Sequence, residues 1–263
     1  MLSAQNLRIG YAERVLALNI SFNLDHGKVI AILGPNGSGK TTLFRTLLGL
    51  TPALQGAALL NGRAISELTP EVIARAVAYV PQVSANFANF SVIEVVLMAR
   101  APHLPWYASP GTKDRAIAEN ALAELNIGDF ADREFTELSG GERQLVMIAR
   151  ALASEATILL MDEPTASLDF GNQFLILDEI AALKARGVAV IFTTHHPDHA
   201  LRIADQTLTI ARDGKVEIGA TGIVLNAASL TALYGIDIDL INSRHGPGIA
   251  VSPGFARPLP GPV

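Results

Sequence analysis

A glycine-rich turn near the N-terminus has the residue types that bind phosphate. Its members are Gly34, Pro35, Asn36, Gly37, Ser38, Gly39, Lys40, Thr41 and Thr42. The turn follows an apolar run at residues 29–33 and precedes a segment expected to be helical to about Gly49. Glycine lets backbone N–H groups close on phosphate oxygens, and a helix N-terminus adds its dipole. We predict a phosphate-binding loop in which Lys40 reaches the β and γ phosphates of a nucleotide and the Thr41 hydroxyl binds magnesium.

Residues 138–144 form a second segment that could bind phosphate. Ser139, Gly140 and Gly141 open a stretch expected to be helical to about residue 153, and Glu142 sits favourably in its first turn. One nucleotide cannot easily use both loops. The economical interpretation is that the second loop serves a nucleotide held by another copy of the chain.

Two carboxylates, Asp162 and Glu163, end a short apolar run before Pro164. In parallel sheets, ligands gather at the carboxyl ends of the strands. Asp162 is therefore expected to hold magnesium through water, and Glu163 to act as a general base on the attacking water. Acidic residues also cap many ordinary strands, so this interpretation depends on the phosphate-binding loop.

With these residues in place, the chain resembles the ATP-binding subunit of an ABC transporter along its length to about residue 242. Residues 138–144 match the family signature. The resemblance implies a head-to-tail homodimer, in which each ATP lies between one P-loop and the partner's signature. It also implies an α/β fold: a P-loop NTPase core with a parallel sheet, a small N-terminal antiparallel sheet and a helical insertion subdomain at about residues 86–155.

The resemblance assigns further residues to the site. Tyr11 matches the aromatic residue that stacks on adenine, although a packed strand tyrosine is the plainer alternative. Gln82 matches the glutamine that senses magnesium and the attacking water, and His195 matches the switch histidine near the γ-phosphate. Asp169 lies in the loop that meets the other protomer and couples the two sites. The implied cofactors are ATP and Mg²⁺.

His195, His196 and His199 together invite a metal-site interpretation. A structural zinc site needs four ligands, however, and the chain has no cysteine. We expect His196 and His199 to be polar residues at a helix start instead.

Composition agrees with this assignment. The 263 residues are 49% hydrophobic, which supports a sizeable core, and the net charge of −5 gives no basic footprint for nucleic acid. We see no signal peptide, and the apolar runs are far shorter than the roughly 20 residues of a membrane span. Transport would require membrane partners, and we expect the chain to lie at the cytoplasmic face of the inner membrane, bound peripherally through permease subunits.

The order of elements can also be predicted. Strands are expected at residues 2–24 and 57–65, with turns at Gly10 and at Asn61 and Gly62. Later in the chain we expect a helix at 172–186, a strand at 188–193, a hairpin around Asp213 and Gly214, and a last helix at 228–234. We place the nucleotide-binding domain at residues 1–242. Residues 243–263 contain five prolines and four glycines and are expected to form an extended tail.

The transported substrate is indicated by weaker patterns. Residues 90–103, expected to contact the permease, are similar to the corresponding stretch in importers of iron–siderophore complexes, haem and cobalamin, although Ala99 stands where those usually have glycine. Such importers have many-helical permeases and a periplasmic or surface substrate-binding protein. Residues 133–136 and 192–195 also resemble a molybdate or tungstate importer. A solvated helix end is the alternative interpretation of Arg100 and His103.

A different class also fits the length. Soluble ABC ATPases of iron–sulfur cluster assembly have one domain of similar size. The DNA-repair type, with its long coiled coil, and the translation type, with two nucleotide domains, do not fit 263 residues.

Overall fold

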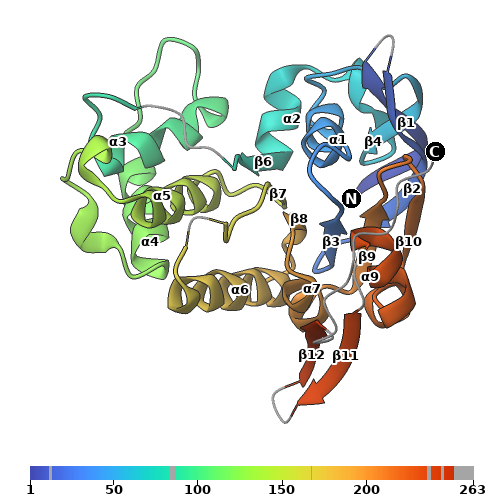
Figure 1. Ribbon diagram of the computed structural model, residues 1–263. Coiled ribbons are helices and arrows are strands. Elements are labelled where there is room, and N and C mark those ends of the chain that lie inside the picture. Colours follow the sequence, from blue (N-terminus) through green and yellow to red (C-terminus); the bar gives the residue numbers. More distant parts are fainter. Residues whose placement is uncertain (12–13, 83–86, 167, 236–237, 244–245, 252–263) are drawn as a thin grey trace.

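Figure 1 shows a computed structural model of the chain, which describes residues 1–11, 14–82, 87–166, 168–235, 238–243 and 246–251. Its central feature is a six-stranded sheet with strand order β10-β9-β3-β8-β7-β6. The strands are β3 (Val29–Leu33), β6 (Val77–Val80), β7 (Ile158–Met161), β8 (Ala189–Thr194), β9 (Gln206–Ile210) and β10 (Val216–Ala220). All neighbours are parallel except β9 and β10, which form the predicted hairpin. The predicted P-loop fold with a parallel sheet is thus confirmed.

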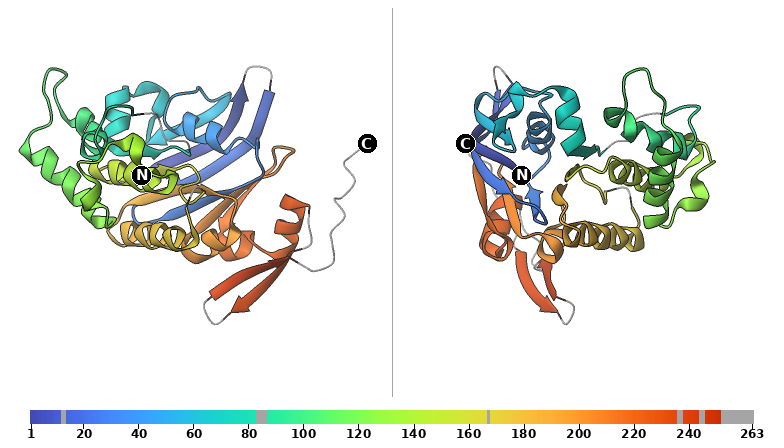
Figure 2. Two further views of the ribbon diagram at one scale, coloured as in Figure 1. Left: turned by 60° about the vertical axis from the view of Figure 1, so that its left-hand side comes forward. Right: turned by 180° about the vertical axis from the view of Figure 1, so that it is seen from behind.

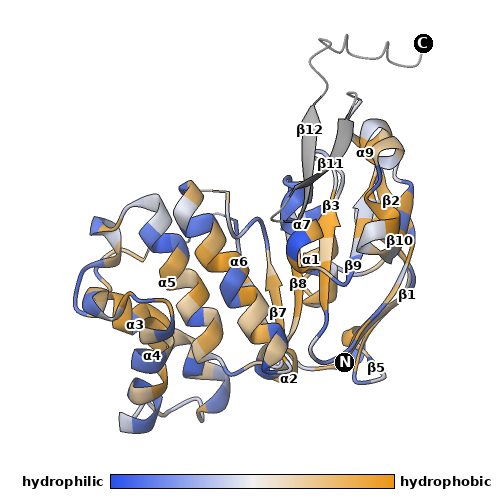
Figure 3. Cartoon of the chain, turned by 90° about the horizontal axis from the view of Figure 1, so that it is seen from below, coloured by the Kyte–Doolittle hydropathy of each residue, from blue (hydrophilic) through white to orange (hydrophobic). Residues whose placement is uncertain are grey.

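The short apolar runs in the sequence become the middle strands of this sheet. Every residue of β3, β7 and β8 is buried, as expected where layers cover both faces of a parallel sheet. Figure 3 shows β3 and β7 as hydrophobic along their length. Alternate residues of β3 enter different cores, since Ile30 and Ile32 pack on one face and Ala31 and Leu33 on the other.

A second, antiparallel sheet covers one face, as predicted. Its order is β2-β1-β4-β5, with β1 (Leu2–Tyr11), β2 (Arg14–Leu24), β4 (Gln55–Leu60) and β5 (Arg63–Ala64). The turn between β4 and β5 holds Asn61 and Gly62 at φ 50° and 80°, the backbone that a tight hairpin requires. Helix α1 (Lys40–Leu47) contributes Leu43, Phe44 and Leu47 to the core that both sheets share.

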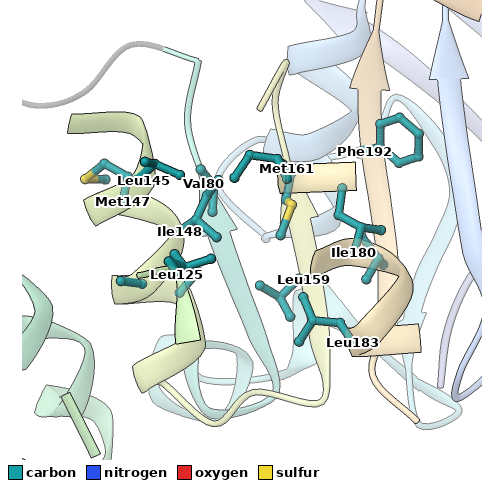
Figure 4. Close-up of a cluster of buried hydrophobic side chains, with 14 of the residues drawn as sticks. Val80, Leu125, Leu145, Met147, Ile148, Leu159, Met161, Ile180, Leu183 and Phe192 are labelled. Atoms are coloured by element: carbon teal, nitrogen blue, oxygen red, sulfur yellow. The ribbon is translucent and has the colours of Figure 1, made fainter. Parts of the chain in front are cut away.

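Helices cover the other face of the parallel sheet. In Figure 4, Leu159 and Met161 of β7 lie between Ile148 of α5 (Gly140–Ala153) and Ile180 of α6 (Phe170–Ala185). Helices α7 (Pro197–Ile203), α8 (Thr221–Val224) and α9 (Ala227–Tyr234) add side chains to the same core. Helix α2 (Pro70–Ala76) and the 3₁₀ turn η1 (Ile65–Glu67) instead contribute Ile73 and Ile65 to the core that the two sheets share.

The predicted helical insertion stands to one side of the sheets (Figure 2). It contains α3 (Val92–Leu97), the 3₁₀ helix η2 (Met98–His103), α4 (Thr112–Glu124), η3 (Gly128–Phe130), η4 (Phe135–Glu137) and α5. The apolar residues predicted at helical spacing form the buried side of α4 and its C-terminal end: Ala121, Leu122 and Leu125 are buried in the larger core, and Ile117 packs against it.

Several element boundaries differ from the predicted ones, among them the start of α6 and the start of the C-terminal tail. Helix α6 begins two residues earlier than predicted, because the Asp169 carboxylate accepts the N–H of Asn172 at 2.8 Å and caps the helix. The predicted start of the tail at residue 243 falls inside a hairpin of β11 (Ile238–Ser243) and β12 (Gly246–Val251). Regular structure therefore extends into the segment predicted as tail, and residues 252–263 lie outside the described part. Within the described ranges, no helix is long and apolar enough to span a membrane.

Phe44 should be critical to stability, because its ring is fully buried between the sheets and meets Tyr79 edge-on, with centroids 6.1 Å apart. We expect Phe44→Ala to lower the free energy of unfolding by about 3 to 5 kcal/mol, measured by urea denaturation. Leu50→Ala is the control, since that side chain is 64% exposed; its loss should stay within about 0.5 kcal/mol. Equal losses in the two variants would contradict this assignment.

Candidate nucleotide-binding site

The glycine-rich turn joins β3 to α1 at the carboxyl edge of the parallel sheet. A Cβ atom added at Gly34 would lie 2.5 Å from the Ile210 carbonyl oxygen, so a larger residue cannot fit there. Gly39, which precedes α1, has φ 105°, a conformation that other residues rarely adopt. The predicted loop therefore needs glycine at both positions for its own backbone geometry.

Lys40 is almost fully buried inside this loop. Its Nζ donates to the carbonyl oxygens of Gly34 at 2.7 Å and Pro35 at 3.3 Å, and lies 4.0 Å from Oε1 of Glu163. Burial lowers the pKa of Lys40, and the negative charges of Glu163 and Asp162 oppose that shift. The Ser38 hydroxyl is buried without a hydrogen-bond partner among the described residues. A buried ammonium and an unsatisfied hydroxyl in one loop fit an anionic phosphate ligand.

Asp162 joins the loop to the end of β7. Its Oδ2 accepts the Thr41 hydroxyl at 2.7 Å, and its Oδ1 accepts the Thr193 hydroxyl at 2.6 Å. Carboxylate and hydroxyl oxygens are the hard donors that Mg²⁺ prefers. The pair of Thr41 and Asp162, with the amide oxygen of Gln82 as a further donor, therefore fits the predicted magnesium.

Thr193 is a site residue that the sequence analysis missed. Its hydroxyl accepts the backbone N–H of Glu163 at 2.8 Å while it donates to Asp162. The register of β7 and β8 pairs Met161 with Phe192, so the next residue of each strand emerges at the same edge. The signal available in the sequence was its place directly before Thr194 and His195, at the end of a predicted strand.

Gln82 and His195 converge on Glu163. Gln82 Nε2 donates to Oε2 at 2.7 Å, and His195 Nε2 contacts Oε1. Glu163 is 8% exposed and has φ 50°, a left-handed conformation that costs a non-glycine residue about 1 to 3 kcal/mol. The three predicted residues, which follow β6, β7 and β8, thus meet around one carboxylate. A carboxylate held this way can accept a proton from a water molecule.

Tyr11 borders the same site from the antiparallel sheet. Its hydroxyl lies 3.5 Å from Oγ1 of Thr42, and its side chain is half-exposed. Tyr11, Arg14 and Leu16 line a cleft of about 510 Å³ together with the glycine-rich turn, Gln82 and Glu163. This volume lies in the range of small-molecule sites, and the exposed ring is able to stack on a ligand.

The second glycine segment does not reach this cleft within one chain. Ser139 and Glu142 form a capping box at the start of α5: Ser139 Oγ accepts from Glu142 N at 3.3 Å, and Glu142 accepts from Ser139 N at 2.7 Å. Hydrogen bonds from the backbone and then the side chain of Ser139 lower the pKa of the Glu142 carboxyl. A Cβ atom added at Gly140 would meet nothing within 4 Å, so the chain's own fold does not require glycine there. The neighbouring Gly141 is partly exposed.

The remaining predicted residues lie nearby. Asp169 caps α6 and is followed in the chain by the exposed Phe170; Ser167 lies outside the described residues. His199 is buried, with Nδ1 3.4 Å from the hydroxyls of Thr165 and Thr194. Burial and the neighbouring His196 lower the pKa of His199 to about 4, so it is a neutral hydrogen-bonding group. Among the described residues, no cluster of three His, Cys, Asp or Glu side chains could hold a metal.

Comparisons with known proteins agree with this geometry. The family model described as "ABC transporter" matches residues 17–166. An uncharacterized ABC transporter ATP-binding protein of Haemophilus influenzae is 39% identical over 244 residues, or 93% of each chain. The molybdate import ATP-binding protein MolC of that organism is 38% identical, in an alignment that covers 89% of this chain and 87% of MolC.

Two solved structures extend the similarity to the fold. One is an inward-facing ABC transporter assigned to the metal-chelate type, with a TM-score of 0.84 and 34% identity over 95% of this chain and 97% of that one. The other is a dimeric bacterial ABC transporter cassette, with a TM-score of 0.75 and 26% identity over 84% of this chain and 99% of that one. The chain therefore belongs to the ABC transporter family, as an ATP-binding protein that hydrolyses ATP to drive transport.

Proposed function

We propose that two copies of this chain power an importer of a metal chelate, such as an iron–siderophore complex, haem or cobalamin. The convergence of Lys40, Thr41, Asp162 and Glu163 at one edge of the sheet carries the enzymatic part of this proposal. We place the dimer at the cytoplasmic face of the cell membrane, bound to many-helical permease subunits and supplied by a substrate-binding protein.

Each residue around the cleft has a role that its contacts support. Tyr11 stacks on adenine, the glycine-rich turn binds the phosphates through backbone N–H groups, and Lys40 turns from its carbonyl partners toward the β and γ phosphates. Thr41, Gln82 and Asp162 would hold Mg²⁺, which would neutralise charge on the phosphate oxygens. Phosphoryl transfer depends mainly on such positioning and charge neutralisation.

Hydrolysis requires a general base, and Glu163 has the position for it. Its carboxylate takes a proton from the attacking water, while Gln82 and His195 hold the two carboxylate oxygens in place. The Thr193 hydroxyl accepts the backbone N–H of Glu163 and donates to the Asp162 carboxylate, and so orients both residues. These hydrogen bonds stabilise the strained backbone at Glu163.

The partner protomer completes the site. Ser139, Gly140, Gly141 and Glu142 stand at the exposed start of α5, away from the cleft of their own chain. The open space at Gly140 allows close approach of the partner's nucleotide, and Asp169 lies in the loop that couples the two protomers. Release of phosphate then reopens the dimer.

An apolar groove on the helical subdomain supports a permease partner. It has a volume of about 400 Å³ and is lined mostly by residues of α3, η2 and the following loop, among them Phe90, Leu97, Met98, Leu104 and Trp106. Trp106 is 96% exposed and Tyr107 is 75% exposed. Large exposed aromatic side chains of this kind mark protein interfaces. The groove includes part of the predicted contact segment at residues 90–103 and continues into the loop that follows it.

Molybdate or tungstate is the second candidate substrate, because MolC shares 38% identity with this chain. The similarity to a metal-chelate type transporter over 95% of the chain favours the chelate. A soluble ATPase of iron–sulfur cluster assembly remains the alternative of a different class, and it would need no permease.

Glu163→Gln should abolish most turnover while preserving ATP binding, because the amide cannot accept the proton of the attacking water. We expect kcat to fall about a hundredfold to ten-thousandfold, and size-exclusion chromatography with ATP to show a trapped dimer. Glu119→Gln, on the exposed face of α4, is the matched control and should hydrolyse ATP normally. Near-normal turnover by Glu163→Gln would remove it as the base.

Lys40→Ala should weaken nucleotide binding, because it removes the cation of the phosphate-binding loop. Titration with a fluorescent ATP analogue should show a loss of affinity of about tenfold or more. Lys215→Ala is the control, since the exposed Lys215 ammonium pairs with the exposed Asp213 in the turn between β9 and β10. Unchanged affinity in Lys40→Ala would contradict the assignment of the loop.

Purification of the tagged chain from solubilised membranes tests the transporter assignment. We expect a many-helical permease to co-purify, and the reconstituted complex to take up a metal chelate in preference to molybdate, measured with labelled substrates. Preference for molybdate would favour the second candidate. Absence of a many-helical partner would contradict the transporter assignment and favour the soluble class.

A further inference from the structure

The 3₁₀ helix η2 presents two different faces. A 3₁₀ helix has three residues per turn, so side chains three apart lie above one another. Met98, Ala101 and Leu104 follow that spacing and line the apolar groove. Arg100 and His103, also three apart, point instead to the end of α5. One short helix thus connects the groove with the helix that carries the signature.

Arg100 makes the central contacts. Its side chain is buried, and Nη1 donates to the Ala153 carbonyl oxygen and to Oε2 of Glu155, both at 2.8 Å. Its Nε donates to Oδ1 of Asp114 at 3.0 Å, at the start of α4. Breaking a buried, paired charge of this kind is strongly unfavourable. The guanidinium therefore holds η2, the start of α4 and the end of α5 together.

His103 adds a second contact at the same helix end. Its Nε2–H donates to the Ser154 carbonyl oxygen at 2.9 Å. The last carbonyl groups of a helix lack partners within the helix, so an N–H donor from another element satisfies one of them. The alternative prediction of a solvated helix end is wrong for Arg100, because it is 5% exposed.

Helix α5 extends from these contacts to the signature. With 14 residues it is about 21 Å long, and its first turn carries Ser139 and Glu142. The Pro102 carbonyl oxygen of η2 also accepts an exposed hydrogen bond from Arg75 Nε at 2.6 Å. A displacement of the groove can reach α5 through the contacts of Arg100 and His103, in addition to the apolar core that α3 and α5 share.

We propose that Arg100 and His103 fasten the end of α5 to the permease-binding groove, so that movement of the groove repositions the signature at the other end of the helix. This proposal rests on the proposed function. Arg100 and His103 are positioning residues and touch no nucleotide.

Spin labels on two cysteines test the fastening in the isolated chain, which has no cysteine of its own. Tyr107→Cys reports the groove and Glu137→Cys reports the segment before the signature, since both side chains are exposed. In this double-cysteine variant, pulsed electron paramagnetic resonance should give a narrow distribution of distances between the two labels. Arg100→Met should widen it about twofold or more, as expected for a lost coupling contact. Arg115→Ala, which breaks only an exposed pair on α4, should leave the width unchanged.

Further variants keep the test decisive. His103→Ala removes one contact without leaving a buried charge unpaired, and it should also widen the distance distribution. This variant provides the test if Arg100→Met fails to fold. Arg100→Lys keeps the charge but cannot make the forked contacts, so its width should be intermediate. Unchanged width in every folded Arg100 and His103 variant would overturn the fastening.

The assembled transporter tests the consequence. In Arg100→Met, hydrolysis by the isolated subunit should stay within about twofold of normal, whereas stimulation by the permease should fall about fivefold or more. Full stimulation, despite a widened distance distribution, would overturn the coupling role. If no permease co-purifies with the unmodified chain, the proposed function is contradicted. The spin-label distances in the isolated chain still test whether Arg100 and His103 hold the groove to the end of α5.

Discussion

Parallel pairing of four strands is the constraint on which the site depends. Leu33 pairs with Thr194, Met161 with Phe192, and Val80 with Met161. The residues that follow these strand ends therefore emerge at one edge of the sheet. Every side chain of β3, β7 and β8 is buried, on one face or the other. A slip of one residue would move each side chain into the opposite core and disrupt the packing on both faces, so the cores hold the edge in place.

The chemistry at that edge depends on charges that are buried but satisfied. Lys40, Asp162 and Glu163 are each less than a tenth exposed. Hydrogen bonds from Thr41, Thr193 and Gln82 and the nearby Lys40 ammonium satisfy the two carboxylates. In a region of low dielectric such a network is rigid when complete and unfavourable when one member is lost. The site is therefore prepared before any ligand binds.

The two glycine-rich segments of the chain lie in different parts of the fold. The cleft is lined by the glycine-rich turn and by residues of β1 and β2. The signature lies at the start of α5, which Figure 1 shows beside α3 and α4 in the helical subdomain. The helical subdomain has its own buried interior of α3, α4 and α5 side chains, continuous with the core under α6. In the function that we propose, a partner protomer brings its signature to this cleft, and α5 transmits movement from one end of the subdomain to the other.

Local backbone requirements made much of the fold predictable. The glycine-rich turn, the capping box of Ser139 and Glu142 and the turn at Asn61 and Gly62 each need particular residues within a few positions. The apolar runs likewise identified the buried strands. The hairpin at residues 238–251 was not anticipated, because its proline- and glycine-rich half has little hydrophobic alternation.

The sequence by itself predicted the phosphate-binding loop, the acidic pair and the signature, because each is a run of consecutive residues beside a recognisable strand or helix. Only the tertiary structure decided the role of Thr193, the meeting of Gln82 and His195 at Glu163, and the inward direction of Arg100. Those contacts join residues about 30 to 80 positions apart. Local periodicity carries no record of such pairs, because sheet register and helix packing set them.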